Sequence, residues 1–483
     1  MAQTFFWYDF ETFGVNPAKD WPCQFAGIRT DANFNEIGEP INIYCRLPND
    51  QLPHPEACLV TGILPEEANE KGVCEAEFID RINQEFSVPN TCVLGYNTLR
   101  FDDEVTRHSL YRNFQDPYAR EWQNGCSRWD LIDVVRLCAA LRPDGIHWPE
   151  REDGTRSFKL EELTKANGIA HEGAHDALSD VRATIAMARL LREKQPRLFD
   201  YVLNNRLKWQ VAKQLDTVSS RPKPVIHISG KYPAVKHCLA MVAPLGAHPT
   251  NKNEVVVYDL SVDPQSLLES SAEDIRYRMF TSSKTLQEEG LERIPVKTIR
   301  LNRCPIIVPW KTAGAEDCER IGLDQQLWQK HYKQLFQSAE QVAQLRQKMA
   351  EVFLGGEQRE GSDDPDLMLY SGGFFSNEDR DLIGRVKNTH PGELAGLNLP
   401  FSDGRLSEML FRYRGRNWPD LLAGQDAQDW QSFRRERLVE GEGWNLQLFF
   451  ERIEQLAQDA DNPKNIEILN RLADYGRRLA EDL

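Results

Sequence analysis

Two carboxylates interrupt an apolar stretch near the start of the chain. Residues 4–12, TFFWYDFET, have the aromatic and apolar composition of a buried strand, yet they include Asp9 and Glu11. In a strand, residues i and i+2 point to the same face, so both carboxylates project together. Two like charges at that distance are unfavourable unless a cation lies between them. The spacing favours a metal site; the alternative is a strand end that emerges into solvent.

A second acidic group follows the next apolar run. In LGYNTLRFDDEVTR, residues 94–107, a strand ends at Asn97 and Asp102 lies in the opening turn of a predicted helix. Acids in that turn are ordinary helix N-terminal residues, because the helix dipole favours them. The dipole explains one acid easily, but it explains Asp102, Asp103 and Glu104 together less well. The excess of acids favours a role beyond helix capping.

The third group, HEGAHDALSD at residues 171–180, has two interpretations. From His171 it matches the H-E-x-x-H pattern of zinc metalloproteases, which needs one helix running through both histidines. A glycine falls inside that turn and costs about 1 kcal/mol relative to alanine in a helix. Asp176 instead looks like a helix start, which places His175 on a loop and Asp180 on the first turns of the helix. The sequence therefore argues against zinc, and removing His171 is expected to leave the protein's activity untouched.

The elements that would position these groups form an α/β domain. Three consecutive strands followed by alternating helices and strands predict a mixed sheet covered by helices. The predicted strands cover residues 4–10, 24–30, 41–47 and 91–96, and the predicted helices cover residues 65–86, 100–112, 131–141, 158–166 and 176–194.

Two further segments follow this domain. A helical connector leads into five short β-like runs between residues 224 and 310, spaced by Gly, Pro and Asn, which predict a small barrel or open sheet. A helical stretch, a polar acidic linker and a long helical region complete the chain. The predicted domains cover residues 1–197, 198–354 and 367–483, with the linker at residues 355–366.

The composition is that of a globular protein and excludes several classes. The ten cysteines include no C-x-x-C pair, which argues against a zinc ribbon or a disulfide framework and favours a reduced cytoplasmic protein. The sequence contains no run of about 18 apolar residues, so no membrane span is predicted. The N-terminus also lacks the basic region that begins a signal peptide. The net charge of −16 by itself argues against a nucleic-acid partner. A local basic groove, or metal ions held by carboxylates, can reverse the sign where a phosphate binds.

Three motifs together carry a family resemblance. DFET, NTLRFDDE and HDALSD resemble the three exonuclease motifs of the DEDDh branch of the DnaQ-like superfamily, whose fold is RNase H-like. SRWDLIDVVR, LTKANGI, QPRLFDY and LFRYRGRN extend the similarity to the bacterial exonuclease I family along essentially the whole chain. The resemblance implies an RNase H-like exonuclease domain, an SH3-like domain and an all-helical C-terminal domain. It also implies 3′→5′ degradation of single-stranded DNA to 5′-mononucleotides, in DNA repair or recombination.

The same resemblance assigns roles to the acidic residues. It implies that Asp9, Glu11, Asp102 and Asp180 bind two Mg²⁺ ions, which Mn²⁺ can replace, and that His175 is the general base. The F-D step of the family motif favours Asp102 over Asp103. Oxygen ligands also select magnesium or manganese over zinc. Glu11 would further touch the terminal 3′-hydroxyl of the substrate.

Basic and aromatic side chains alternate after the second motif, as a channel for one nucleic-acid strand requires. The same basic-aromatic pattern occurs in FRYRGRNW, residues 411–418, where a solvated arginine face is an equally good interpretation. The predicted DNA contacts are Arg107, Tyr118, Trp122, Arg128, Lys159, Arg206 and Lys208, besides Glu11.

The expected partners are single-stranded DNA and, by the family resemblance, the C-terminal tail of single-stranded DNA-binding protein. The chain is expected to be a monomer without membrane contact. Two alternatives remain open at the level of sequence. The motifs do not distinguish DNA from RNA, because they do not contact the sugar, and a protein with this fold can also be a non-catalytic scaffold that binds single strands. The presence of all five expected residue types argues against the scaffold.

Overall fold

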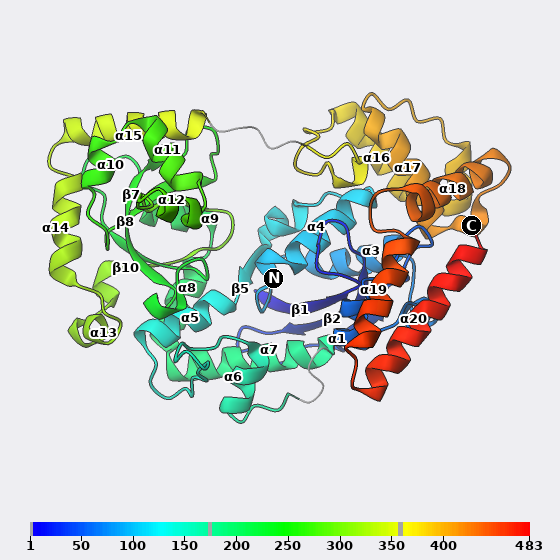
Figure 1. Cartoon of the computed structure of the whole chain (residues 1–483), viewed down its shortest axis with the longest axis horizontal. Helices are drawn as coiled ribbons and strands as arrows, with labels where there is room; N and C mark the ends of the chain where they lie inside the picture. The colour runs from blue at the N-terminus through cyan, green and yellow to red at the C-terminus, as the bar shows by residue number, and fades with distance from the viewer. Residues whose placement is uncertain (1–2, 172–175, 356–360) are drawn as a thin grey trace. The chain divides into compact units, whose positions relative to one another are not determined.

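The computed structural model describes residues 3–171, 176–355 and 361–483 (Figure 1). Internal contacts divide the chain into two compact units. The first comprises residues 1–128, 171–185 and 360–483, and the second comprises residues 129–170 and 186–359. The candidate catalytic acids all belong to the first unit.

The N-terminal sheet is mixed, as the sequence predicts. Its strand order is β3-β2-β1-β4-β5, in which β1 pairs antiparallel with β2 and parallel with β4. The central strand β1 therefore has neighbours on both sides, and Asp9 and Glu11 lie opposite Ala26 and Gln24 of β2. The strands are β1 (Thr4–Thr12), β2 (Pro22–Thr30), β3 (Ile41–Tyr44), β4 (Thr91–Gly95) and β5 (Ser127–Asp130).

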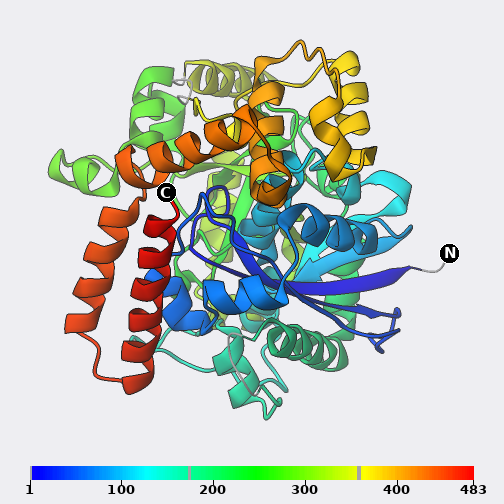
Figure 2. The same cartoon turned by 90° about the vertical axis from the view of Figure 1, so that its right-hand side faces the viewer.

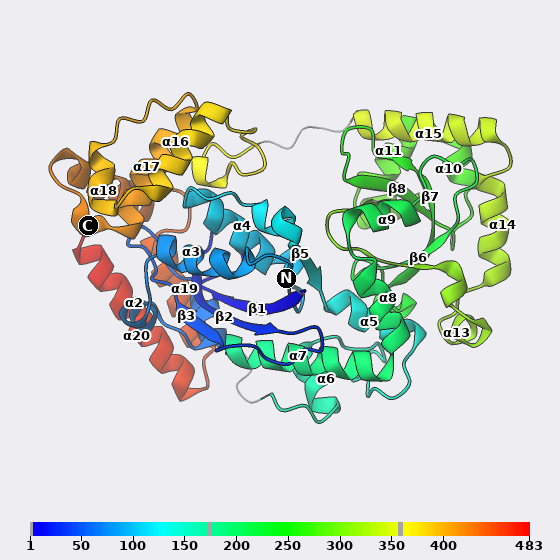
Figure 3. The same cartoon turned by 180° about the vertical axis from the view of Figure 1, so that it is seen from behind.

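Alternation along β1 separates the core from the candidate site. Phe6, Tyr8 and Phe10 pack in one buried cluster with Phe25 and with helix α3. Side chains one position away point to the opposite face, which is where Asp9 and Glu11 belong. Figures 1 and 3 show α3 and α4 on one side of the sheet and α7 on the other. The helices are α1 (Pro55–Thr61), α2 (Pro65–Lys71), α3 (Glu75–Phe86), α4 (Asp102–Arg112), α5 (Ile132–Leu141), α6 (Leu160–Ala166) and α7 (Ala177–Lys194).

Two details differ from the prediction for this region. The single helical pattern at residues 65–86 is two helices, because the chain turns at Gly72, where a Cβ atom would lie 2.4 Å from the Ala68 carbonyl oxygen. Helix α1 and strand β5 were not predicted, since neither has the length or the alternation that a pattern needs.

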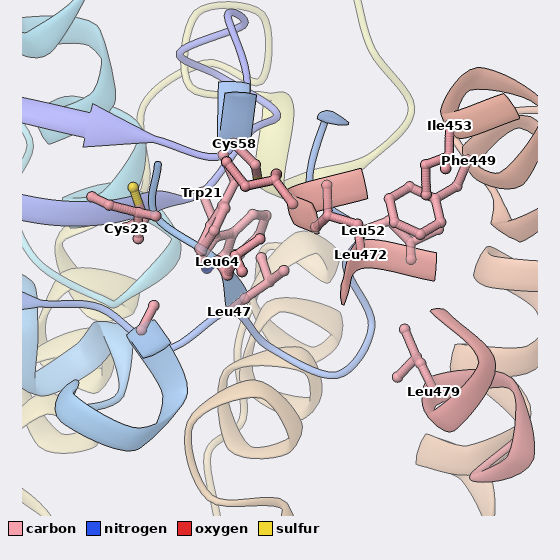
Figure 4. Close-up of a cluster of buried hydrophobic side chains, with 14 of the residues drawn as sticks. Trp21, Cys23, Leu47, Leu52, Cys58, Leu64, Phe449, Ile453, Leu472 and Leu479 are labelled. Carbon is pink, nitrogen blue, oxygen red and sulfur yellow. The ribbon is translucent and has the colours of Figure 1, made fainter. Parts of the chain in front are cut away.

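The C-terminal helices complete the first unit. Figure 4 shows a buried cluster in which Trp21, Leu47 and Leu64 from the N-terminal region meet Phe449 and Leu472 from the last two helices. Figure 2 shows these two helices, in red, side by side. The helices are α16 (Asn377–Asn388), α17 (Gly404–Asn417), α18 (Gln425–Arg435), α19 (Leu446–Gln458) and α20 (Pro463–Glu481).

The second unit contains an antiparallel sheet, and all five predicted β-runs are strands. The strand order is β10-β6-β7-β8-β9. Three short helices between β8 and β9 were not predicted, although Ser271 and Ser282 cap two of them through side-chain hydrogen bonds. The strands are β6 (Val225–Ile228), β7 (Leu239–Ala247), β8 (Glu254–Asp259), β9 (Val296–Arg300) and β10 (Ile306–Pro309). The helices are α8 (Pro196–Asn204), α9 (Lys208–Gln214), α10 (Gln265–Glu269), α11 (Ala272–Phe280), α12 (Ser283–Glu288), α13 (Ala315–Arg320), α14 (Gln325–Leu335) and α15 (Ala339–Leu354).

Across the described ranges, no helix combines the length and the apolar character that crossing a bilayer requires. The domain boundaries stay a prediction. The end of the predicted linker is more than a flexible connection, because Asp366 is buried and accepts hydrogen bonds from Arg412 and Arg416 of α17.

Candidate active site

Three carboxylates from distant parts of the sequence converge at the end of β1. Asp9, Glu11 and Asp180 each offer a ligand atom, and these atoms all lie within 4.8 Å of one another. Asp9 and Glu11 come from β1, and Asp180 comes from the first turn of α7. Among the described residues, neither Asp9 nor Glu11 has a salt-bridge partner. The arrangement therefore concentrates negative charge.

The electrostatic cost of this arrangement appears in the pKa values. Burial, with the neighbouring charges of Asp102, Glu11 and Asp180, raises the pKa of Asp9 well above its usual range. Burial together with Asp180, Asp102 and Asp176 raises the pKa of Glu11 to about 8. Both shifts disfavour the ionised acids, and a bound cation would reverse them.

Asp102 lies beside the three converging acids and is held by the backbone. It is the first residue of α4, and its Oδ1 accepts a hydrogen bond of 3.0 Å from the backbone N–H of Phe10. Phe10 stands between Asp9 and Glu11 in β1, so this bond ties the start of α4 to the acidic strand. Asp102 is also among the charges that raise the pKa of Asp9 and Glu11.

The adjacent Asp103 has a different environment. Its carboxylate is buried, accepts a hydrogen bond of 2.8 Å from Arg120 and one of 3.1 Å from the Tyr8 hydroxyl, and pairs with Arg128. Burial alone would raise the pKa of Asp103, but Arg128 and Arg120 outweigh it and hold the pKa well below its usual range. Its charge is already compensated, so Asp103 has no need of a metal.

In the described part of the third motif, the helix starts only after the segment that matches the zinc-protease pattern. Helix α7 begins at Ala177, after both histidines, and Asp176 caps it by accepting a hydrogen bond of 3.1 Å from the backbone N–H of Ser179. His175, the predicted general base, lies outside the described residues. His171 is described, and its Nε2 contacts Oδ1 of Asp180 directly. This contact was not predicted, because it depends on how His171 packs against the start of α7 and has no sequence signal.

The donor set fits a divalent metal ion. All the converging ligand atoms are carboxylate oxygens, which are the donors that hard cations prefer. The raised pKa values of Asp9 and Glu11 are the expected result of placing such acids together without a positive charge. Asp9, Glu11 and Asp180 are therefore suited to hold the ion, with Asp102 beside them.

Comparison with known proteins gives the family. Three domain-family models match: Exonuclease over residues 6–188, Exonuclease I SH3-like domain over residues 206–355, and Exonuclease I C-terminal domain over residues 363–479. Exodeoxyribonuclease I of Haemophilus influenzae is 45% identical over 476 residues, which cover 99% of this chain and 98% of the relative. Exodeoxyribonuclease I of Escherichia coli is 44% identical over 477 residues, with the same two coverages of 99% and 98%. The chain belongs to the exodeoxyribonuclease I family.

Solved structures of this family share the whole fold. E. coli exonuclease I in complex with a dA16 oligonucleotide has a TM-score of 0.93 and 44% identity, covering 99% of this chain and 100% of that one. Exonuclease I from Methylocaldum szegediense has a TM-score of 0.92 and 48% identity, again covering 99% and 100%. A zinc-ion-bound form of the E. coli complex with single-stranded DNA has also been solved, in keeping with a family that binds divalent metal ions.

The residues predicted to contact DNA fall into two groups. Trp122 is 66% exposed, the Lys159 side chain is 65% exposed, Lys208 is exposed and Tyr118 is half-buried. Arg107, Arg128 and Arg206 are instead buried. The guanidinium group of Arg107 pairs with Glu104 and Glu121, and that of Arg128 pairs with Asp103 and Glu121. Contact of these three arginines with DNA stays a prediction, and the structure gives Arg107 and Arg128 a role in internal ion pairs.

The basic-aromatic run at residues 411–418 is neither a solvated arginine face nor an open cationic surface. Arg412 and Arg416 are buried. Arg416 pairs with Asp50 and Asp366, and Arg412 pairs with Asp364 and Asp366. In this member of the exodeoxyribonuclease I family, the run therefore joins α17 to the end of the predicted linker.

Proposed function

We propose that this chain is a 3′→5′ exonuclease that degrades single-stranded DNA by metal-dependent phosphodiester hydrolysis and releases 5′-mononucleotides. The observation that carries the proposal is the convergence of Asp9, Glu11 and Asp180 within 4.8 Å, in a chain 45% identical to an exodeoxyribonuclease I. Motifs alone would leave open whether the acids meet. The convergence favours an enzyme over a non-catalytic scaffold, because a scaffold has no need for acids held in mutual repulsion.

Asp9, Glu11, Asp102 and Asp180 would hold two Mg²⁺ ions, for which Mn²⁺ can substitute. Bound ions of this kind activate water, neutralise the charge that develops on the phosphate and stabilise the leaving oxygen. The protein's contribution is to hold the carboxylates ready: the backbone N–H of Phe10 orients Asp102, and β1 fixes the spacing of Asp9 and Glu11. Oxygen donors favour magnesium or manganese over zinc.

His175 would act as the general base. An imidazole titrates near neutrality, so one ring nitrogen can accept the proton of the attacking water at working pH. This role rests on the HDALSD motif. Glu11 would also contact the terminal 3′-hydroxyl, which would align the last nucleotide for cleavage.

The exposed side chains are suited to guide the strand. Trp122 and Tyr118 offer rings on which bases can stack, and Lys159 and Lys208 offer ammonium groups for phosphates. Arg107 forms a cation–π contact with Tyr118, at 5.5 Å from the ring centroid. Arg107 would therefore hold the Tyr118 ring even while its own charge pairs with Glu104 and Glu121.

The test is a time course on a 5′-labelled single-stranded DNA oligomer with Mg²⁺, run beside His175→Ala. The expected result is a ladder that shortens from the 3′ end, with labelled products becoming progressively shorter, and its loss in the variant. Binding without cleavage in either Mg²⁺ or Mn²⁺ would contradict the proposal. The same oligomer made of RNA tests the competing substrate, and faster cleavage of RNA would overturn the assignment of DNA.

Single-stranded DNA-binding protein is proposed as the partner. A structure described as SSB/exonuclease I in complex with an inhibitor supports this within the family. Fluorescence anisotropy with a labelled peptide of the C-terminal tail of that protein tests it directly. The expected result is saturable binding that an unlabelled tail peptide displaces. Absence of binding at every concentration at which the protein stays in solution contradicts the proposal.

A further inference from the structure

His171 lies against the candidate metal site but is not part of the converging ligands. Its Nε2 contacts Oδ1 of Asp180, and its side chain is only 6% exposed. In the described part of the chain, the side chains whose ligand atoms converge within 4.8 Å are Asp9, Glu11 and Asp180, and His171 is not among them. The histidine is therefore placed to act on a metal ligand instead of on the metal.

The chemistry of the pair defines what His171 can do. An ionised carboxylate only accepts hydrogen bonds, so contact with Asp180 in its metal-binding form requires the proton on Nε2 of His171. A donor held on Oδ1 fixes the rotation of the carboxylate and leaves Oδ2 available as a ligand. Hydrogen bonds of this kind to metal-binding residues orient them and commonly change metal affinity by about 10–100-fold.

The position of Asp180 explains why such a donor matters. Asp9 and Glu11 lie on one strand, which fixes their relative spacing, whereas Asp180 comes from the first turn of a separate helix. Its side chain is 20% exposed and is repelled by Asp9 and Glu11. The hydrogen bond from His171 opposes the rotation of the Asp180 carboxylate that this repulsion favours.

We propose that His171 is a positioning residue that orients the Asp180 carboxylate for a divalent metal ion. The inference rests on the proposed function, because it assumes that Asp180 is a metal ligand. It gives the first histidine of HEGAHDALSD a role distinct from zinc ligation. It also replaces the expectation, made from the sequence, that His171 can be removed without effect.

The experiment is isothermal titration of the full-length protein with Mn²⁺ in the absence of DNA. His171→Ala is expected to weaken Mn²⁺ binding by about 10–100-fold. His171→Gln retains an amide N–H near the position of Nε2 and is expected to recover most of the affinity. His147→Ala is the matched control, since His147 is exposed and bonds to Asn167 through its backbone only. Thermal unfolding in EDTA checks that each variant is folded.

A second readout separates positioning from a purely structural role. If His171 acts through Asp180, the Mn²⁺ concentration that gives half-maximal nuclease activity rises in His171→Ala, while the activity at saturating Mn²⁺ largely returns. A folding defect would lower the saturated activity as well and would not be repaired by Gln. Mn²⁺ binding in His171→Ala that is as tight as in the unaltered protein, or tighter, overturns the inference.

Asp180→Asn distinguishes this failure from failure of the proposed function. Loss of Mn²⁺ binding in Asp180→Asn with no loss in His171→Ala removes only the role of His171. Unchanged Mn²⁺ binding in Asp180→Asn would show that Asp180 is not a ligand, and both the metal site and the inference would then be wrong.

Discussion

Asp102 and Asp103 are adjacent in sequence, and both are buried in the first turn of α4, yet they belong to opposite electrostatic regions. Asp102 lies with Asp9, Glu11 and Asp180, where like charges raise pKa values. Asp103 lies with Arg120, Arg128 and the Tyr8 hydroxyl, where the two guanidinium groups lower its pKa. We call the first region the acidic site and the second the Asp103 cluster. The Asp103 cluster contains its own guanidinium groups, whereas the described neighbours that raise the pKa values of Asp9 and Glu11 are themselves acids.

The contrast between the two regions identifies the acids that are available for chemistry. A buried acid with its own arginines contributes to folding, because removing either partner leaves an uncompensated charge. Asp9 and Glu11 instead lie among other acids, which disfavours their ionised forms unless a positive charge binds. The carboxylates that destabilise the metal-free fold are therefore the ones that can bind a metal.

The largest expected effect is the loss of catalysis from the acidic site. Asp9→Asn removes a carboxylate of the proposed metal site and is expected to lower kcat by about a thousandfold or more, since metal ions contribute several kcal/mol to such transition states. Single-turnover cleavage of labelled single-stranded DNA in Mg²⁺ measures it. Glu70→Gln, an exposed acid on α2, is the control and should leave kcat unchanged. Near-normal activity in Asp9→Asn would show that catalysis does not depend on the acidic site.

The next effect is on the stability of the protein and comes from the Asp103 cluster. Asp103→Asn leaves Arg120 and Arg128 without their shared carboxylate and is expected to lower the free energy of unfolding by about 3–5 kcal/mol. The measurement is the urea midpoint in EDTA, at constant slope. Asp9→Asn should be no less stable than the unaltered protein in the same assay. Equal destabilisation by both substitutions would abolish the distinction between the two regions.

The stability of the metal-free protein should also depend on pH because of the acidic site. Folding raises the pKa of Glu11 from 4.5 to about 8, so its stabilising contribution is complete below pH about 4.5 and is lost as pH rises through about 8. Melting temperatures in EDTA should therefore fall between these pH values. Glu11→Gln should flatten the decline, and saturating Mn²⁺ should remove it. A metal-free melting temperature that rises over this range, in a manner that depends on Glu11, contradicts the assignment.

The smallest expected effect is on the free energy of unfolding and comes from Tyr370, which bonds to the ion pair of Glu104 and Arg107. The Tyr370 hydroxyl donates to Glu104 and accepts a hydrogen bond of 3.2 Å from Arg107. Tyr370→Phe is expected to cost about 1 kcal/mol of unfolding free energy. Tyr277→Phe removes a similar hydroxyl–carboxylate bond, to Glu289. Among the described residues no arginine donates a hydrogen bond to the Tyr277 hydroxyl, so this substitution should cost less. An equal cost in the two variants would show that the arginine adds nothing.

Much of the acidic site was predictable because local rules place its members. The alternation of β1 puts Asp9 and Glu11 on one face, and Asp176 marks the start of α7 through its capping geometry. The five strands of the second unit were likewise predicted from short apolar runs between turn residues. Helices α10–α12 were not, because their short amphipathic patterns lie between strands and are stabilised by tertiary packing more than by propensity.

The arginines show what the sequence leaves undecided. Arg107, Arg128, Arg412 and Arg416 have the spacing of a nucleic-acid surface, but each is buried against carboxylates from other segments. The sequence shows that a side chain carries a charge. Only the folded structure shows whether that charge is already paired. For Asp102 and Asp103 the family motif favoured Asp102, and the structure adds the physical difference, since adjacent residues on a helix point in different directions.

The sequence alone determined the class of fold, the spacing of the three acidic motifs and the oxygen donors that they offer, because alternation, capping and donor type act over a few residues. Tertiary structure alone decided which carboxylates face one another and which face arginines, and it brought His171 to Asp180. His171 and Asp180 are nine residues apart, whereas Asp9 and Asp102 belong to segments that are much farther apart in the sequence. The free energy of bringing them together depends on the packing of the whole unit, so it cannot be predicted from a short stretch of sequence.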